Sequence, residues 1–249
     1  MSKRWRIGAV SYLNTRPFIL GMEQSGLIEQ IDLKKDYPAQ IAQALLEDRI
    51  DIGLVPVAVI PLLKDPYYIS DFCIGAEQEV ASVAIFSEVP LDKIEKVYLD
   101  HQSRTSVQLA RLMMELYWER QVEWIAAEPD YIEKIGGTIA GVIIGDRALV
   151  AQQRFPYVYD LAAAWKKYTG LPFVFATWVS NKPIPEEFKK QFDAANAYGL
   201  NHLDEVIESI GQEEMIYDLK KYYTQNISYA FTEEKKKGLD LFLKLLARP

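Results

Sequence analysis

Short apolar runs alternate with amphipathic stretches through the N-terminal part of the chain. Residues 6–10 form a strand candidate, and a polar turn separates them from a helical segment that has Pro17 in its first turn, where a missing N–H costs little. Residues 31–35 and 52–55 are further strand candidates, and Pro38 opens a helix between them. Strands that alternate with helices favour a mostly parallel sheet covered on both faces, with ligands at the carboxyl ends of the strands. The pattern predicts an α/β fold.

The same alternation starts again after a loop that contains Pro61 and Pro66. Residues 80–86 form an apolar strand candidate with the hydroxyl of Ser82 inside it, and a helix is expected directly after residues 103–106. Further strands are expected at residues 97–99, 122–125 and 140–144. These elements predict a second α/β lobe of an acceptable domain size.

The C-terminal part of the chain has a different pattern, with one strand followed by helices. Residues 171–179 form an apolar strand, which we expect to be the return crossing between the lobes, and from Pro185 onward the pattern predicts helices that pack on the first lobe. We therefore expect residues 1–80 and 180–249 to form lobe I, and residues 81–179 to form lobe II with the hinge crossings.

The amino-acid composition limits the classes of molecule that the protein is expected to bind. Of the 249 residues 49% are hydrophobic, which provides for a substantial core, and the net charge of −7 argues against nucleic acid or an anionic membrane as the main partner. A small anion is still possible, because local hydrogen-bond donors decide its binding. Cys73 is the only cysteine, so an intrachain disulfide and a four-cysteine zinc site are excluded.

Two further features concern the cellular location. No apolar run approaches the roughly 20 residues that cross a bilayer, so no membrane span is expected. Residues 1–6 lack the apolar core of a secretory signal, which predicts a cytoplasmic protein.

Common catalytic signatures are absent from the sequence. There is no glycine-rich dinucleotide or phosphate loop, no zinc-hydrolase motif and no nucleophile elbow. His101 and His202 are the only histidines and lie far apart in the sequence, so a histidine-based triad or metal site would require both to converge on folding. Nucleotide-binding and zinc-hydrolase functions therefore have little support from the sequence.

Three strand-to-helix turns have similar polar compositions. Residues 11–15 follow the first strand, residues 103–106 follow a strand of the second lobe, and Gly145-Asp146 follow another. Hydroxyls, an amide and free N–H groups at helix starts can together hold a carboxylate or a phosphate. Two such turns on opposite lobes would form a cleft for a small organic anion.

Each of these residues also has a simpler interpretation. Ser11, Asn14, Ser103 and Thr105 are residue types that cap helices. The following candidates have other ordinary roles: Arg16 and Arg104 as solvated charges, Ser82 as a donor to a neighbouring carbonyl, and Asp146 as a helix cap. Composition and spacing alone therefore predict no more than a two-lobed binder of a small anion.

Five segments in a fixed order carry a specific resemblance. They resemble the chorismate dehydratases of the futalosine pathway of menaquinone biosynthesis, and they cover most of residues 6–180. The segments are GAVSYLNTRPF at 8–18, DIGLVP at 51–56, SRTSVQLA at 103–110, IGDRAL at 144–149 and WKKYTGLPFVFA at 165–176. The helical C-terminus is similar only in a loose way. The resemblance implies the two-lobed fold of periplasmic binding proteins (type II), an α/β fold with mixed, mostly parallel sheets and a cleft between the lobes.

The resemblance also implies an activity. Chorismate would lose water to give 3-[(1-carboxyvinyl)oxy]benzoate, a carbon–oxygen lyase reaction that requires no metal or redox cofactor. Asn14 and Ser82 match the positions at which the family places side chains against the substrate, so both are expected to be catalytic. The remaining expected contacts to the substrate are Ser11, Ser103, Arg104, Thr105, Ser106, Gly145 and Asp146. The base is left open, and the enolpyruvyl carboxylate of the substrate is one candidate.

Two alternatives accompany this expectation. A sister family with the same fold makes 1,4-dihydroxy-6-naphthoate and is expected to use a histidine in its cleft, whereas His101 lacks the motif of that family. The other alternative is a small-anion binding protein, either cytosolic or exported. A monomer and a homodimer are both compatible with the sequence.

Overall fold

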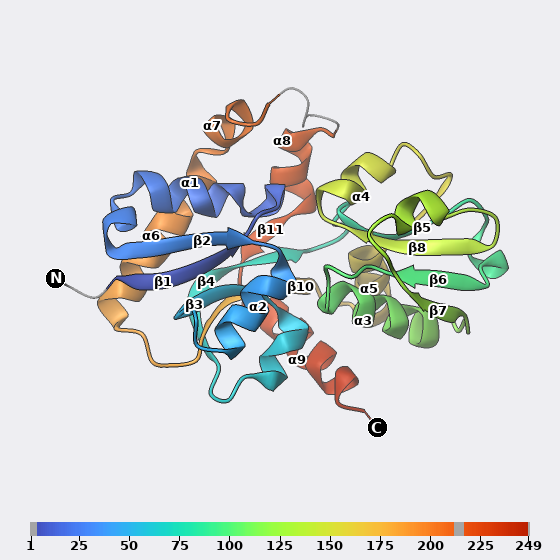
Figure 1. The fold of residues 1–249 in the computed structure, drawn as a ribbon, viewed down its shortest axis with the longest axis horizontal. Helices are drawn as coiled ribbons and strands as arrows, with labels where there is room; N and C mark the ends of the chain where they lie inside the picture. The colour runs from blue at the N-terminus through green and yellow to red at the C-terminus, as the bar shows by residue number, and fades with distance from the viewer. Residues whose placement is uncertain (1–3, 212–216, 249) are drawn as a thin grey trace.

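The computed structural model describes residues 4–211 and 217–248, which form two β-sheets side by side with helices packed around each (Figure 1). The first sheet contains, in spatial order, β11 (Ser228–Ala230), β4 (Tyr67–Ala76), β10 (Phe173–Ser180), β3 (Ile52–Pro56), β1 (Trp5–Val10) and β2 (Ile31–Asp36). The second contains β7 (Glu123–Ala126), β6 (Lys96–Leu99), β8 (Ile139–Ile144), β5 (Val83–Ser87) and β9 (Tyr157–Asp160). We call the part of the chain around each sheet the first lobe and the second lobe.

Both sheets are mixed, and in each of them most strands run in one direction. In the first sheet β1, β2 and β3 are parallel, and β10 is antiparallel to both β3 and β4. In the second sheet β6 is parallel to β7 and β8, whereas β5 is antiparallel to its two neighbours. The expected α/β fold with mixed sheets is confirmed.

The helices follow the predicted alternation with the strands. Pro17 and Pro38 both lie in the first turn of a helix, as their positions in the sequence predict. The helices are α1 (Arg16–Gln24), α2 (Pro38–Leu46), α3 (Thr105–Leu112), α4 (Asp146–Ala151), α5 (Leu161–Thr169), α6 (Glu186–Asn201), α7 (Leu203–Glu208), α8 (Leu219–Lys221) and α9 (Glu233–Leu246).

Burial follows the position of each strand in its sheet. The interior strands β3 and β10 are buried along their whole length, so their sequences are almost continuously apolar. The edge strand β2 is mostly polar and carries Lys34 and Lys35, which discourage pairing with another chain. One contiguous apolar cluster includes residues of both lobes, and a smaller cluster lies within the second lobe.

Two predictions about the strands require correction. The expected strand at 80–86 begins only at Val83, so Ser82 precedes the strand. The segment expected to be a loop around Pro66 contains the ten-residue strand β4. Residues 171–179 correspond to β10, by which the chain returns from α5 of the second lobe to the first sheet, where it lies between β3 and β4.

The C-terminal part is helical as expected, and the helices pack on the first lobe through contacts of α6 with α1 and of α9 with β10. It also contains β11, which was not predicted. This strand pairs with β4 and brings the C-terminal segment to the edge of the first sheet.

Candidate functional site

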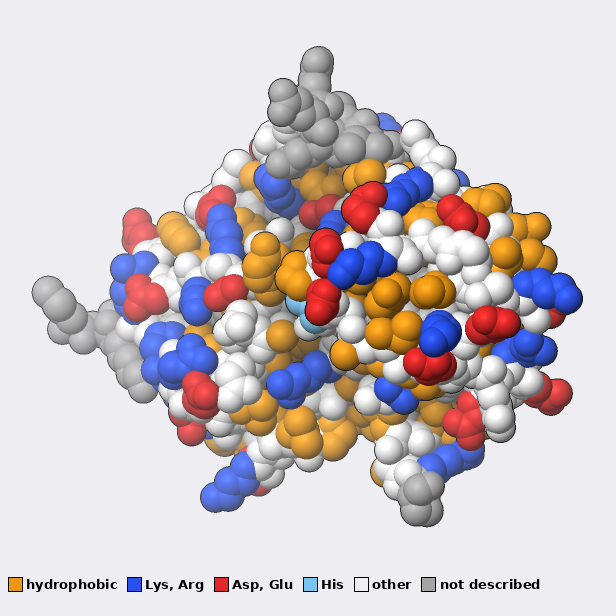
Figure 2. Space-filling model, turned by 45° about the vertical axis from the view of Figure 1, so that its right-hand side comes forward, with side chains coloured by type: hydrophobic (Ala, Val, Ile, Leu, Met, Phe, Trp, Pro, Cys, Tyr) orange, Lys and Arg blue, Asp and Glu red, His pale blue; other side chains and the backbone are white. Residues whose placement is uncertain are grey.

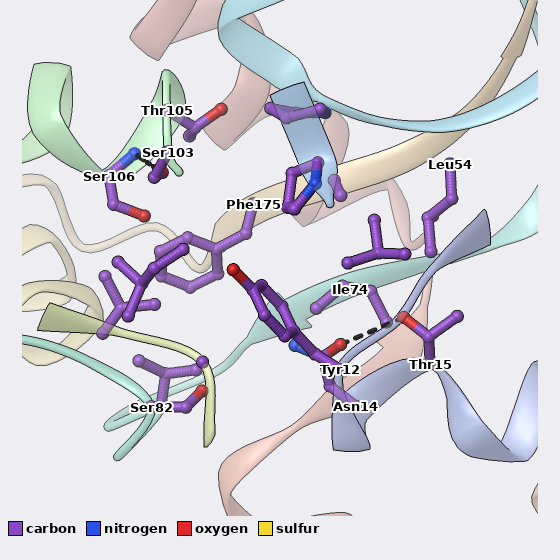
Figure 3. Close-up of a pocket in the computed structure, with 18 residues that line it drawn as sticks. Tyr12, Asn14, Thr15, Leu54, Ile74, Ser82, Ser103, Thr105, Ser106 and Phe175 are labelled. Carbon is purple, nitrogen blue, oxygen red and sulfur yellow. Dashed lines mark hydrogen bonds between the residues drawn. The ribbon is translucent and has the colours of Figure 1, made fainter. Parts of the chain in front are cut away.

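A cavity lies between the two lobes, with about 540 Å³ of free space when its solvent-facing part is included. The polar part of its wall comes from both lobes and consists of Tyr12, Asn14, Thr15, Ser82, Ser103, Thr105, Ser106 and Gly145 (Figure 3). The rest of the wall is apolar and includes Leu54, Ile74 and Phe175. Among the described residues that form the wall there is no Asp, Glu, Lys, Arg or His. An apolar cavity with a few convergent polar groups is typical of a site for a small organic molecule.

Asn14 reaches the cavity from a short turn at the end of β1. The turn is a 3-10 segment, Leu13–Thr15, which leads directly into α1. The hydroxyl of Thr15 donates to Oδ1 of Asn14 at 3.1 Å. The nitrogen end of Asn14 therefore lies on the side away from Thr15 (Figure 3).

Ser82 reaches the same cavity from the opposite lobe. It is 1% exposed and directly follows Ala81, which has a φ of 61°. This left-handed conformation is unfavourable for an alanine, so the surrounding structure must hold it in place. The carboxylate of Asp160 provides that support, because it accepts hydrogen bonds from the backbone N–H groups of Val80 at 2.9 Å and Ala81 at 2.8 Å.

Asp160 also caps α5 by accepting from the N–H of Ala163 at 2.9 Å. Burial raises the pKa of Asp160 to about 6, although its three backbone hydrogen bonds act in the opposite direction. The folded protein therefore keeps this proton over a pH range in which the unfolded chain, with an ordinary pKa of 3.8, has released it. The contribution of Asp160 to the free energy of unfolding is therefore fully present below about pH 4. As the pH rises through about 6, this contribution is lost, which lowers the free energy of unfolding by up to about 3 kcal/mol.

We expect Asp160→Asn to remove this component of the pH dependence. Measured by urea unfolding between pH 4.5 and 7.5, the variant should lose less stability with rising pH than the wild type, because asparagine does not titrate. Asp65→Asn, at an exposed position, is the matched control and should retain the wild-type slope. Equal slopes for Asp160→Asn and the wild type would contradict the prediction.

The start of α3 supplies the second-lobe hydroxyls. The hydroxyl oxygen of Ser103 accepts from the N–H of Ser106 at 2.9 Å, so Ser103 does stabilise the helix start as a capping residue would. The hydroxyl oxygen of Thr105 accepts from the N–H of Ala58 at 3.1 Å, which ties this helix start to the first lobe. Ser103, Thr105 and Ser106 are all buried and all line the cavity.

Three other predicted contact residues lie outside the cavity wall. Ser11 is exposed and faces a surface hollow beside α1, and Arg104 is exposed and faces a hollow beside α9. The carboxylate of Asp146 accepts from the N–H of Leu13 at 3.1 Å, so it joins the second lobe to the turn that carries Asn14. Of the predicted set, the structure brings together Asn14, Ser82, Ser103, Thr105, Ser106 and Gly145.

Tyr12 closes one side of the cavity and contacts the second lobe. Its hydroxyl donates to Gln102 at 2.6 Å, and Gln102 also accepts from Arg147, which forms an ion pair with the buried carboxylate of Asp100 at 2.7 Å. The Tyr12 ring packs on Gly145, which has a φ of 64°, and a Cβ there would lie 3.2 Å from the ring. Both the backbone conformation and the close ring thus favour glycine at this position.

Sequence reasoning missed three tyrosines of the C-terminal segment. Tyr222 donates to the Ser82 hydroxyl oxygen, Tyr223 to the carbonyl of Leu13, and Tyr229 to the carbonyl of Asn14, each at 2.9 Å. All three side chains are buried, and burial raises the pKa of the Tyr222 and Tyr229 hydroxyls well above the ordinary value. Their sequence signal is weak, because buried tyrosines usually belong to the core.

Figure 2 shows acidic and basic side chains interspersed over the face that it presents. Within residues 4–211 and 217–248, no helix has both the length and the apolar character needed to cross a membrane. The same residues contain no group of three or more His, Cys, Asp or Glu side chains placed to hold a metal ion.

Comparison with known proteins identifies a family for the chain. A family model described as menaquinone biosynthesis matches residues 5–248. Chorismate dehydratase from Thermus thermophilus is 27% identical over 270 residues, which cover 94% of this chain and 97% of that protein. Chorismate dehydratase from Campylobacter jejuni is 26% identical over 248 residues, covering 95% of each.

Comparison with solved structures identifies the fold of the chain. The periplasmic aliphatic sulphonate binding protein of Escherichia coli superposes with a TM-score of 0.61 at 15% identity, covering 100% of this chain and 94% of that one. The fold is therefore the two-lobed α/β fold of periplasmic binding proteins. The family model spans nearly the whole chain, and the two chorismate dehydratases align with 94% and 95% of it. The chain belongs to the menaquinone biosynthesis family.

Proposed function

We propose that this protein is a chorismate dehydratase that eliminates water from chorismate to give 3-[(1-carboxyvinyl)oxy]benzoate. The observation that carries the proposal is the meeting of Asn14 and Ser82, one from each lobe, on one cavity whose described wall has no charged side chain. The relatives named chorismate dehydratase support the same substrate.

The proposed reaction breaks a C–H bond and a C–O bond on two neighbouring carbons of the substrate ring. The proton leaves the carbon that bears the enolpyruvyl ether, and the electron pair spreads through the conjugated double bond into the ring carboxylate. The hydroxyl on the neighbouring carbon then departs and takes up a proton, so that one water molecule is lost and the ring becomes aromatic. Hydrogen-bond donors placed where negative charge develops lower the barrier of such a reaction.

The chain offers neutral donors for this purpose. In our proposal Asn14 and Ser82 bind the reacting edge of the ring and its leaving hydroxyl. The start of α3, with Ser103, Thr105 and Ser106, binds a carboxylate through hydroxyl and N–H groups. Ser11, Arg104 and Asp146 have no contact with the substrate in this proposal, because they lie outside the cavity wall.

The base in this proposal is the enolpyruvyl carboxylate of the substrate itself. Among the described residues, the cavity wall contains no carboxylate, histidine or lysine that could accept the proton. The ether oxygen of chorismate places its side-chain carboxylate close to the carbon that loses the proton, which makes an intramolecular transfer favourable.

The proposal is tested by incubating the purified protein with chorismate and following the reaction by liquid chromatography and mass spectrometry. We expect a product that is lighter than chorismate by one water molecule and coelutes with synthetic 3-[(1-carboxyvinyl)oxy]benzoate. Saturable binding of chorismate without product would favour a binding protein. Neither His101 nor His202 lines the cavity, so a histidine-dependent naphthoate synthase has no support from the site.

A further inference from the structure

Tyr222 lies behind the cavity wall and connects the two residues to which the proposed function assigns the chemistry. It is 0% exposed and does not itself line the cavity. Its hydroxyl donates to the hydroxyl oxygen of Ser82 at 2.9 Å and also interacts with the side chain of Asn14. It begins a short π-helical segment, Tyr222–Asn226, and packs against Tyr223 and Tyr217 through its ring.

The direction of these hydrogen bonds determines what the cavity presents to a ligand. Burial raises the pKa of Tyr222 well above its ordinary value, although Ser82 and Asn14 act in the opposite direction, so the phenol keeps its proton near neutral pH. A phenol that donates to Ser82 occupies a lone pair of that oxygen and leaves the Ser82 proton for another acceptor.

The amide of Asn14 is fixed in a related way. Its oxygen accepts the Thr15 hydroxyl and one of its N–H groups faces the Tyr222 hydroxyl, so the second N–H is a donor for another partner. The nitrogen end of Asn14 lies away from Thr15, on the side from which Ser82 approaches (Figure 3). Asn14 and Ser82 therefore both have donors to offer, and the matching ligand group is an acceptor.

We infer that Tyr222 is a positioning residue that orders the Ser82 hydroxyl, so that Ser82 and Asn14 donate together to the leaving hydroxyl of the substrate. This inference rests on the proposed function. The leaving oxygen gains negative charge as its bond to the ring breaks, and two ordered donors stabilise it more in the transition state than in the ground state. Tyr222 itself acts only through Ser82 and Asn14.

The first test replaces Tyr222 by phenylalanine, which removes the hydroxyl and retains the ring. We expect kcat for chorismate to fall about 10- to 50-fold with KM changed by less than about threefold, because an interaction of the transition state is lost rather than uniform binding. Tyr131→Phe is the matched control: Tyr131 is equally buried, its hydroxyl donates to Val142 and Asp100, and it packs in the separate apolar cluster of the second lobe. The control should lose a comparable amount of thermal stability and keep its kcat within about twofold.

A double-mutant cycle then separates a positioning role from a structural one. In a Ser82→Ala background the Tyr222→Phe change should lower kcat by a clearly smaller factor than it does in the wild type, because Ser82 is already absent and only the interaction with Asn14 is left to lose. Tyr131→Phe should have the same small effect in either background. The inference would be overturned if the kcat losses of Tyr222→Phe and Ser82→Ala simply multiplied in the double variant. It would also be overturned if Tyr222→Phe kept the kcat of the wild type. Absence of product with the wild type would instead overturn the proposed function.

Discussion

Replacing Asn14 or Ser82 by alanine is expected to lower kcat for chorismate dehydration about 10²- to 10³-fold, the range found when a single donor to a developing negative charge is removed. The two side chains approach the cavity from different lobes, and both are held by neighbours that leave donors for the substrate. Binding depends on the wider wall and on the start of α3, so we expect KM to change much less than kcat.

Steady-state kinetics with chorismate measures this effect, and Ser87→Ala provides the control. Ser87 is also fully buried in the same segment of chain, but its hydroxyl oxygen accepts from the N–H of Val89 and does not line the cavity. Ser82→Ala leaves the Tyr222 hydroxyl without its acceptor, which should cost about 1–3 kcal/mol of stability, and a measured melting curve separates this cost from the catalytic loss. If both Asn14→Ala and Ser82→Ala kept a kcat near that of the wild type, the assignment of the site would be wrong.

The sequence predicted the segments of the site better than the individual side chains. The turns after β1 and β6 and the approach to β5 do meet at one cavity, because strand ends of an α/β fold converge there. Within those turns Ser11 and Arg104 lie next to residues of the wall but point to other surfaces. Which neighbour faces the cavity depends on the local path of the backbone, and composition does not encode it.

Other features depend on partners that are distant in the sequence. Strand β4 carries Tyr67, Tyr68 and Asp71 at exposed positions and follows two prolines, so its local pattern does not indicate a strand. It forms because β10 and β11 pair with it on its two sides. Tyr222 contacts Ser82 only because β11 and the helices before it return to the first sheet, and no local pattern reveals that contact.

The packing of α1 on α6 gives the largest expected effect on stability. Gly21 of α1 and Gly199 of α6 face each other so closely that the two helix backbones touch. A Cβ at Gly199 would lie 1.7 Å from the carbonyl oxygen of Pro17, and a Cβ at Gly21 would lie 1.8 Å from that of Ala195. Neither atom is the flexible end of a side chain, so a substitution forces the helices apart.

Gly199→Ala is therefore expected to reduce the free energy of unfolding by more than about 3 kcal/mol, although alanine favours an isolated helix over glycine by about 1 kcal/mol. Because α1 starts directly after the turn that carries Asn14, the displaced helix should also lower kcat in the fraction that folds. Urea unfolding measures the first effect, and Gly211→Ala, whose Cβ would meet no described atom within 4 Å, should stay within about 0.5 kcal/mol of the wild type. If the Gly199→Ala protein were as stable as this control, α1 and α6 could separate at little cost. The close contact between their backbones would then not hold the Asn14 turn in place.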